Sequence, residues 1–346
     1  MGNAYSEALN LTLPKEQSWK NELGRPPIQR PQKPGSQNRA LSIASVTVAY
    51  NGAQLLPRHF EALKRQIRRI DEIIVVNNAS TDGTATLLAD RYPEITVLNL
   101  SQNSGIGGGL ATGLSYAAVT KKYDWVWLFD QDSVPAEDGL ERLLAGLRHL
   151  DDTEESIAIV APVNIHPGTK MTWPGLLWRG GRVRESPESS QRITFVDSVI
   201  SSGSLIRRAA VEIVGLPRSD FFMDFVDHEH CLRLRRHGFR IAVVRDSLLH
   251  HSNGDPSKFK ILGRTKYWTD HVPWREYYMT RNEIFTVWQY YPKWWSKAFT
   301  LYRLARKALY VLLFGDRKFA CVRMMYLGFL DGRAGRLGIR FLATSR

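Results

Sequence analysis

Two aspartates separated by one residue follow an apolar run in the first half of the sequence. Asp130 and Asp132 flank Gln131, and residues 125–129 before them are all hydrophobic. Paired carboxylates at the end of a strand can bind a hard divalent cation, which can neutralise the phosphates of a substrate. The same aspartates could instead form a turn or cap a helix. Their meaning therefore depends on the elements and motifs around them.

Strands and helices alternate in the segment that leads to these aspartates. Apolar, β-branched runs predict strands at residues 43–50, 72–76, 95–100 and 125–129. Helices are predicted at residues 55–70, 84–92 and 110–120. The alternation indicates right-handed βαβ units and a parallel sheet, which binds ligands beyond the carboxyl ends of its strands. Further strands are expected at residues 157–160, 198–206 and 240–244, and a long polar loop at residues 179–191.

Each of the first four strands leads into a polar or glycine-rich motif. These motifs are residues 48–51, 76–83, 103–109 and 130–132. The glycine-rich motif is not a dinucleotide fingerprint, because from Gly105 that pattern needs glycine where Leu110 stands. Its glycines could let a nucleotide approach the backbone closely, or could let the following helix pack tightly.

Together and in this order, the four motifs resemble those of family-2 glycosyltransferases, and the resemblance covers residues 43–282. Within that family the sequence is most similar to bacterial rhamnosyltransferases, with galactofuranosyltransferases as near relatives. The resemblance implies an α/β fold of the GT-A type, which is a Rossmann-like, mostly parallel central sheet flanked by helices, with a C-terminal helical appendage. It also implies an inverting, metal-dependent hexosyltransferase.

The resemblance places a nucleotide-sugar donor at the strand ends. The implied contact residues are Ala49, Tyr50, Asn51, Asn78, Asp82, Asn103, Gly105, Asp130 and Gln131. The second motif often begins with aspartate in the family, whereas this sequence has Asn77, so contacts that need a carboxylate there are in question. Asn78 and Asp82 could also serve only as turn-making and capping residues.

Two neighbouring histidines are candidates for a further metal ligand. Family members often have a His-Ser-x-Gly pattern at this place, and His251 fits its register, with His250 as the competing residue. The implied metal site therefore consists of Asp130, Asp132 and His251. A nitrogen ligand beside two carboxylates suits Mn²⁺ as well as Mg²⁺. The alternative is that the histidine has only a structural role.

A second acidic motif lies at residues 221–233. The resemblance implies that Asp227 accepts the proton of the acceptor hydroxyl as the sugar is attacked, with Glu229 as the supporting acid. It also matches residues 201–208 to the small-residue strand beside the acceptor pocket. Asp227 and Glu229 could instead be carboxylates that the helix dipole favours at the start of a helix.

These implications predict the donor and the acceptor. We expect transfer of L-rhamnose from dTDP-rhamnose, with inversion, to a hydroxyl of a saccharide or lipid-linked saccharide in cell-surface polysaccharide biosynthesis. No residue distinguishes this donor from UDP-galactofuranose, which stays the alternative. A family member that binds sugar nucleotides without transferring them is a further alternative, although the acid pair and the base argue against it.

Composition divides the chain into three regions. Residues 1–40 are rich in Pro, Gln, Asn and Lys and are predicted to be a flexible arm. Residues 41–282 form the expected catalytic domain, and residues 283–346 a basic, aromatic-rich helical region.

The sequence shows no secretory signal, no window that could span a membrane and only two cysteines, which are far apart. We therefore expect a cytoplasmic location.

The net charge of +13 is concentrated near the C-terminus. Residues 293–346 contain twelve Lys or Arg and two Asp, which contribute 12 − 2 = +10. Basic and aromatic residues together favour an anionic membrane surface, so we expect peripheral attachment at the inner face of the cytoplasmic membrane. The aromatic residues concerned are Trp288, Tyr290, Tyr291, Trp294 and Trp295.

Two other interpretations of this region stay open. Its aromatic residues could pack against the catalytic domain or against a second subunit of a homo-oligomer. The basic composition also occurs in nucleic-acid-binding proteins. Such a protein should carry interleaved basic and aromatic residues on a sheet face, whereas here they concentrate outside the α/β region. We therefore expect no nucleic-acid partner.

Overall fold

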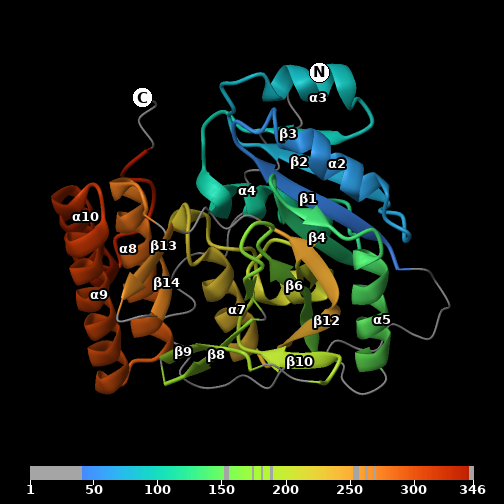
Figure 1. Ribbon diagram of the computed structural model, residues 1–346. Helices are drawn as coiled ribbons and strands as arrows, with labels where there is room; N and C mark the ends of the chain where they lie inside the picture. The colour runs from blue at the N-terminus through green and yellow to red at the C-terminus, as the bar shows by residue number, and fades with distance from the viewer. Residues whose placement is uncertain are drawn as a thin grey trace. The chain divides into compact units, whose positions relative to one another are not determined.

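The computed structural model describes residues 41–151, 156–173, 175–180, 182–187, 190–251, 257–261, 264–268 and 270–342. The arm predicted at residues 1–40 lies outside these ranges. The described chain contains a central mixed sheet with helices on both of its faces, followed by a helical C-terminal region (Figure 1). This arrangement confirms the α/β fold class that the sequence predicted.

The first four predicted strands form the parallel half of the central sheet. They are β1 (Ile43–Ala49), β2 (Glu72–Asn77), β3 (Thr96–Asn99) and β4 (Trp125–Asp130). They lie in the order β4-β1-β2-β3, and every neighbouring pair is parallel. The connecting helices are α2 (Leu56–Lys64), α3 (Thr84–Arg91) and α4 (Gly105–Leu114), which continues as a π-helical segment at Ser115–Thr120. The predicted βαβ units are therefore confirmed.

The second half of the sheet is mixed. Its strands are β6 (Ile157–Ile165), β10 (Ile193–Val196), β11 (Leu205–Arg207) and β12 (Arg240–His250). Strand β11 lies antiparallel between β4 and β6, while β12 runs parallel to β6 and antiparallel to the edge strand β10. The end of β12 therefore lies at the same side of the sheet as the short strand β5 (Val134–Pro135), which directly follows the aspartate pair.

Alternating side chains of β4 build the core on both faces of the sheet. Val126 and Leu128 contact the apolar cluster that covers one face. Trp125, Trp127 and Phe129 belong to the cluster on the opposite face, together with Leu63 of α2 and the leucines at residues 140–150. The other covering helices are α5 (Gly139–Asp151), α6 (Arg208–Val214) and α7 (Val226–Arg236). A strand buried on both faces needs a continuous apolar run, which is what residues 125–129 provide.

The helix predicted at residues 55–70 is shorter in the structure, where α2 ends at Lys64. The next residues bind the segment before α5 instead of continuing the helix. Gln66 donates from Nε2 to the carbonyl of Ala136 (2.8 Å), and its Oε1 accepts from the backbone N–H of Leu140 (3.1 Å). Long-range hydrogen bonds therefore end a helix that periodicity alone would extend.

The polar loop predicted at residues 179–191 is wrong in its first part, which contains a β-hairpin. Strand β8 (Leu176–Arg179) pairs antiparallel with β9 (Arg182–Glu185). Trp178 is buried and packs against Leu232 of α7. One buried side chain thus anchors a hairpin whose second strand is largely charged, and this gave no clear strand pattern in the sequence.

Three helices form the C-terminal region at the left of Figure 1. They are α8 (Pro273–Tyr290), α9 (Trp294–Phe314) and α10 (Lys318–Ala334), and α8 contacts both of the others. A hairpin of β13 (Ser257–Ile261) and β14 (Arg264–Trp268) precedes them. The domain boundary expected between residues 282 and 283 falls inside α8. None of the described helices combines the length and the apolar composition that crossing a bilayer requires.

Candidate active site

Asp130, Asp132 and His251 converge where β4 and β12 end. The possible ligand atoms of the three side chains all lie within 4.8 Å of one another. His251 Nε2 lies 3.5 Å from Asp130 Oδ2, and its Nδ1 lies 3.2 Å from Asp132 Oδ1. The strand predicted at residues 240–244 continues to His250 and thereby carries His251 to the aspartates. Of the two competing histidines, His251 is the one that the described residues place in this cluster.

The donor set of this cluster fits a divalent cation. Two carboxylates and an imidazole are ligands that both Mn²⁺ and Mg²⁺ accept, with Mn²⁺ tolerating nitrogen better. Two serines support the ligands: Ser133 Oγ lies 3.0 Å from His251 Nδ1 and 2.5 Å from Ser202 Oγ. Ser202 Oγ also accepts from the backbone N–H of Asp130 (3.1 Å). Such outer contacts fix the orientation of metal ligands.

A buried histidine of α2, His59, binds the backbone of Ser133 next to this cluster. His59 Nδ1 lies 2.6 Å from the carbonyl oxygen of Ser133, so this nitrogen carries the proton and donates it. His59 Nε2 then accepts from the hydroxyl of Thr47 on β1 (2.8 Å). Burial lowers the pKa of His59 to about 4, so the ring is neutral near pH 7. Nothing in the sequence pattern singled out His59, because its role depends on contacts across 74 residues of chain.

The surroundings of Asp130 disfavour its ionised form. Burial raises the pKa of Asp130 to about 6, the charges of Asp132 and Asp227 act in the same direction, and His251 opposes them. Each additional negative charge makes ionisation of Asp130 more costly. A bound cation would reverse this effect, because it stabilises the ionised form of its carboxylate ligands.

The loops after β1 and β2 are joined by polar contacts. Asn51 Oδ1 accepts from the backbone N–H of Thr81 (2.8 Å), and Asp82 Oδ2 accepts from that of Ala53 (3.2 Å). Desolvation of Asp82 is outweighed by its hydrogen bonds with Thr84 and Ala53, which keep its pKa below the usual value. Asn51 and Asp82 remain exposed, so the loop pair offers polar groups at the carboxyl end of the sheet.

Gln131 links the aspartate motif to the first strand. Its Oε1 accepts from the backbone N–H of Tyr50 (2.8 Å), and its Nε2 donates to the carbonyl of Tyr50 (3.1 Å). Tyr50 is exposed, whereas Ala49 before it is fully buried. The structure thus brings the first and fourth motifs together, as expected for neighbouring parallel strands.

Asn78, Asn103 and Gly105 form the connection into α4. The buried amide of Asn78 donates to the carbonyl of Gly105 (3.0 Å) and accepts from the backbone N–H of Ser104 (2.8 Å). Asn103 Oδ1 accepts from the N–H of Gly105 (2.9 Å). A side chain at position 105 is excluded, because its Cβ would lie 2.0 Å from the carbonyl oxygen of Phe222 and φ is +67°. In this structure the amide of Asn78 is used inside the protein.

Gly109 of this motif and Gly113 after it allow close helix packing. A Cβ at Gly109 would lie 2.4 Å from a methyl of Val48, and one at Gly113 would lie 2.2 Å from a methyl of Val46. Helix α4 therefore lies directly against β1, closer than any residue with a side chain would permit. Tight packing thus explains Gly109 and Gly113, and the close approach of a nucleotide to the backbone stays a prediction.

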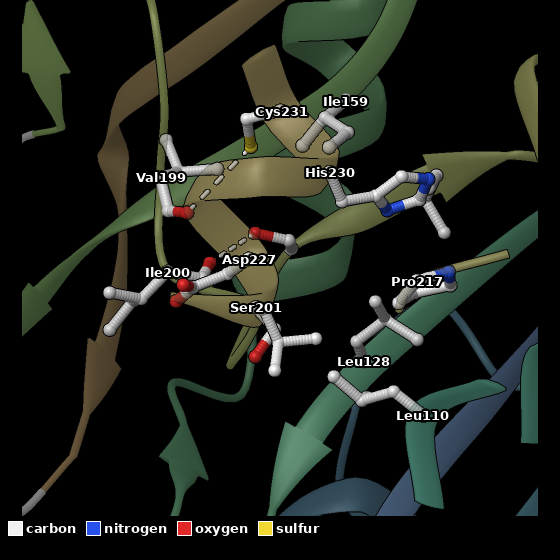
Figure 2. Close-up of a pocket in the computed structure, with 13 residues that line it drawn as sticks. Leu110, Leu128, Ile159, Val199, Ile200, Ser201, Pro217, Asp227, His230 and Cys231 are labelled. Atoms are coloured by element: carbon white, nitrogen blue, oxygen red, sulfur yellow. Dashed lines mark hydrogen bonds between the residues drawn. The ribbon is translucent and has the colours of Figure 1, made fainter. Parts of the chain in front are cut away.

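Asp227 and Glu229 lie at the start of α7 but have different surroundings. Asp227 lies at the edge of a small, mostly apolar pocket of about 20 Å³, and it is close enough to raise the pKa of Asp130 by its charge (Figure 2). Its Oδ1 accepts from the backbone N–H of His228 (2.7 Å). The other pocket residues labelled in Figure 2 include Leu110, Leu128, Ile159, Val199, Ile200 and Ser201.

Glu229 is buried in a contact between helices. Its side chain is 1% exposed, with Oε2 3.2 Å from an Arg233 nitrogen and Oε1 accepting from the hydroxyl of Tyr290 (2.8 Å). The bond from Tyr290 ties α7 to α8. Asp227 and Glu229 therefore do not share one face of the site, and the supporting catalytic role predicted for Glu229 stays a prediction.

The profile of glycosyl transferase family 2 matches residues 45–214, a range that contains the strand-end motifs and the aspartate pair. Residues 45–214 of this chain are a glycosyl transferase family 2 domain. The match ends before the acidic motif of α7 and before His251, so only the tertiary structure brings these residues near the matched motifs. The predicted family is thereby confirmed.

Relatives of this glycosyltransferase include enzymes of the two predicted branches. It is 29% identical to the dTDP-rhamnosyl transferase RfbF of Shigella flexneri over 70% of this chain and 78% of the relative. It is 28% identical to the galactofuranosyltransferase GlfT1 of Mycolicibacterium smegmatis over 69% of this chain and 81% of the relative. An N-acetylglucosaminyl-diphospho-decaprenol L-rhamnosyltransferase of Mycobacterium tuberculosis is 26% identical over 60% of this chain and 75% of the relative.

Solved structures share the fold at low sequence identity. TarS residues 1–349 of S. aureus, in complex with UDP-GlcNAc, matches with a TM-score of 0.54 and 15% identity over 84% of this chain and 81% of that chain. GalNAc-T7 with UDP, GalNAc and Mn²⁺ matches with a TM-score of 0.55 and 14% identity over 86% of this chain and 57% of that chain. These similarities support the GT-A fold of the glycosyltransferase.

Proposed function

We propose that this glycosyltransferase transfers L-rhamnose from dTDP-rhamnose to a hydroxyl of a saccharide or lipid-linked saccharide, with inversion, in cell-surface polysaccharide synthesis. The observation that carries the reaction type is the meeting of Asp130, Asp132 and His251 at the carboxyl end of the sheet, with Asp227 nearby. The named rhamnosyltransferases among its relatives support the donor.

The proposed mechanism divides the work between two groups of residues. Asp130, Asp132 and His251 would hold the divalent cation, Mg²⁺ or Mn²⁺. When bound, that cation supplies positive charge for the departing nucleoside diphosphate. Ser133 would hold the ring of His251, and Ser202 would hold Ser133 and the backbone of Asp130, through the hydrogen bonds described above.

Asp227 performs the proton transfer in this proposal. The acceptor oxygen forms a bond to the anomeric carbon while the bond from that carbon to the diphosphate breaks, and the hydroxyl proton passes to the carboxylate of Asp227. A single displacement inverts the anomeric centre. Asp227 is suited to this role because its side chain is 20% exposed and its charge acts on Asp130, whereas Glu229 is 1% exposed and enclosed by Arg233 and Tyr290.

UDP-galactofuranose is the second candidate donor. The galactofuranosyltransferase of Mycolicibacterium smegmatis supports it, because its identity and coverage nearly equal those of the Shigella flexneri relative. The test is to incubate the purified protein with Mn²⁺ and each of the two donors and to measure nucleoside diphosphate release. Release from dTDP-rhamnose and not from UDP-galactofuranose supports the proposal, and the reverse result replaces the donor.

An exposed apolar surface on α9 and the start of α10 supports attachment to an anionic membrane. Trp294, Tyr302, Leu309, Leu313 and Phe319 are between 55% and 84% exposed. By contrast Trp288, Tyr290 and Tyr291, which were predicted to contact lipid, pack into a cluster around Trp178, Leu232 and Val287. Only the later part of the aromatic stretch is therefore available to a bilayer.

The charges of this region support the same partner. Lys307 and Arg303 face α8, where they pair with the buried Glu276 (2.6 Å) and Glu283 (3.4 Å). Lys293, Arg306 and Arg317 are exposed and flank the apolar surface. Exposed aromatic and apolar residues with nearby cations suit the head-group boundary of an anionic bilayer.

Sedimentation with anionic liposomes tests the attachment. We expect binding at low salt that weakens as salt screens the charges. Replacing Trp294 and Phe319 by serine should reduce binding, whereas Ile67→Ser, at a position 70% exposed on the catalytic domain, should not. Equal binding by the double variant and the wild type would overturn the attachment.

A further inference from the structure

The loop that leads into α7 has an unusual backbone. Phe222, Asp224 and Phe225 have φ values of 64°, 56° and 63°, in the left-handed region that residues with side chains rarely adopt. Such a conformation persists only where the surrounding structure imposes it. Asp227 follows this loop by two residues, so the path of the loop sets the position of the proposed base.

Asn282 of α8 binds the loop from its interior side. It is fully buried, and its Nδ2 donates to the carbonyl oxygens of Phe221 (3.0 Å), Met223 (2.7 Å) and Asp224 (2.9 Å). Its Oδ1 accepts from Nε of Arg281 (2.9 Å), which fixes the amide with the nitrogen toward the loop. The side chain of Asn282 thus provides hydrogen bonds for three inward-facing carbonyl groups of the loop.

Two arginines of the same helix extend this contact. Arg281 is also fully buried, and its Nη2 donates to the carbonyls of Asp220 (3.1 Å) and Phe221 (2.8 Å). Arg275 donates from Nε and Nη2 to the two carboxylate oxygens of Asp224 (3.2 and 3.0 Å). A planar guanidinium that binds both oxygens fixes direction as well as distance.

The opposite side of the loop rests on α4. The carbonyl of Phe222 accepts from the backbone N–H of Gly107 (3.0 Å) and lies where a side chain at Gly105 would stand. The loop is therefore held between α8 on one side and the helix of the glycine-rich motif on the other. No pattern in the sequence predicted the contact of the loop with α8 or its contact with α4.

We propose that Asn282 is a positioning residue that fixes the loop at residues 220–225 and thereby places the carboxylate of Asp227 for proton transfer. This inference rests on the proposed role of Asp227 as the base. It makes α8, which begins inside the expected catalytic domain and ends in the C-terminal region, part of the active-site framework.

The first test measures the loop without any substrate. Asn282→Asp keeps the shape of the side chain but replaces a donor by a charge that repels three carbonyl oxygens. We expect hydrogen exchange of backbone amides in residues 219–228 to become at least about tenfold faster, because local opening becomes easier. Thr286→Val, one turn along α8, is the control, since Thr286 is fully buried and its hydroxyl has no hydrogen-bond partner in the described structure.

The second test measures turnover with water as the acceptor. The probe is dTDP-rhamnose or UDP-galactofuranose, whichever the wild type hydrolyses with Mn²⁺, and the product measured is the nucleoside diphosphate. We expect Asn282→Asp to lower kcat by about 10²-fold, the effect that a displacement of roughly 1 Å can have, with the donor KM nearly unchanged. In an Asp227→Asn background the same substitution should have little further effect, because both act through one group.

The outcomes separate this inference from the proposed function. Normal turnover by Asp227→Asn would remove the base and this inference with it. An inactive Asp227→Asn variant beside a fully active Asn282→Asp variant, or unchanged exchange of residues 219–228, would overturn the positioning role alone. Asn282→Ala, which removes the donor without adding a charge, gives the same comparison where Asn282→Asp does not fold.

Discussion

The cation side and the base side of the site are built in different ways. Asp130 and His251 stand at the ends of neighbouring regions of one sheet, and Ser133, Ser202 and His59 hold them from within the same α/β framework. Asp227 instead follows a loop with a left-handed backbone that α8 binds from outside the sheet. The edge of a sheet can thus place metal ligands by its topology, whereas a base on a loop needs support from a distant segment of the chain.

The largest effect is expected on the cation side. Asp132→Ala should abolish transfer while leaving the fold intact, because it removes a carboxylate ligand from a cluster that has few alternatives. Nucleoside diphosphate release and the melting curve would be measured together. Asp138→Ala is the control, since Asp138 only pairs with Arg142 at the surface (2.6 Å). Full turnover by Asp132→Ala, or by the wild type in metal-depleted buffer, would contradict the assignment.

The next effect concerns the base side. Asp227→Asn preserves shape and removes proton-accepting power, so kcat should fall by roughly 10²- to 10⁴-fold while donor affinity survives. Donor affinity would be measured by thermal stabilisation with dTDP and Mn²⁺. A collapse of donor affinity would show that Asp227 binds or builds structure instead. Asp90→Asn, at an exposed position of α3, should match the wild type in both measurements.

The contact between the two sides can be broken at Gly105. Gly105→Ala places a Cβ 2.0 Å from the carbonyl of Phe222 at a φ of +67°, so the α4 end and the loop must separate. The backbone strain alone costs about 1–3 kcal/mol, which chemical denaturation can measure. Gly83→Ala is a matched control, because no atom lies within 4 Å of its added Cβ. Equal loss for the two variants would show that the contact has no special importance.

The smallest expected effect is on the pH dependence of stability, which His230 on the base side and Asp130 on the cation side should change in opposite directions. Burial lowers the pKa of His230 in α7 to about 3, so the unfolded chain binds a proton below about pH 6.5 that the folded chain refuses. The free energy of unfolding therefore decreases as the pH falls from about 6.5 toward 3. Asp130, whose pKa is raised to about 6, acts oppositely, since the folded chain binds its proton more readily between about pH 6 and 4.

Free energies of unfolding of the metal-free protein between pH 7 and 4.5 measure the two opposed effects. We expect His230→Gln to flatten the loss of stability on acidification and Asp130→Asn to steepen it, each by about 1–3 kcal/mol at most. The same slope in all three proteins would contradict the assigned protonation states.

The parallel half of the sheet and the order of its motifs were predictable from local sequence. Residues 125–129 are apolar without interruption because β4 is buried on both faces, and this local signal needs no knowledge of the rest of the fold. Parallel topology then brings successive strand ends to one edge. That rule alone placed Asp130 and Asp132 together with the loops that carry Asn51 and Asp82.

The contacts of individual polar side chains, by contrast, depend on the folded chain. Asn78 turned inward to hold the start of α4, Glu229 paired with Arg233 and Tyr290, and His251 rather than His250 joined the aspartates. His59 and Asn282 showed no pattern in the sequence, since their partners lie far away along the chain. Hydrogen bonds of a buried side chain are set by the groups that packing brings beside it, and local sequence does not encode that neighbourhood.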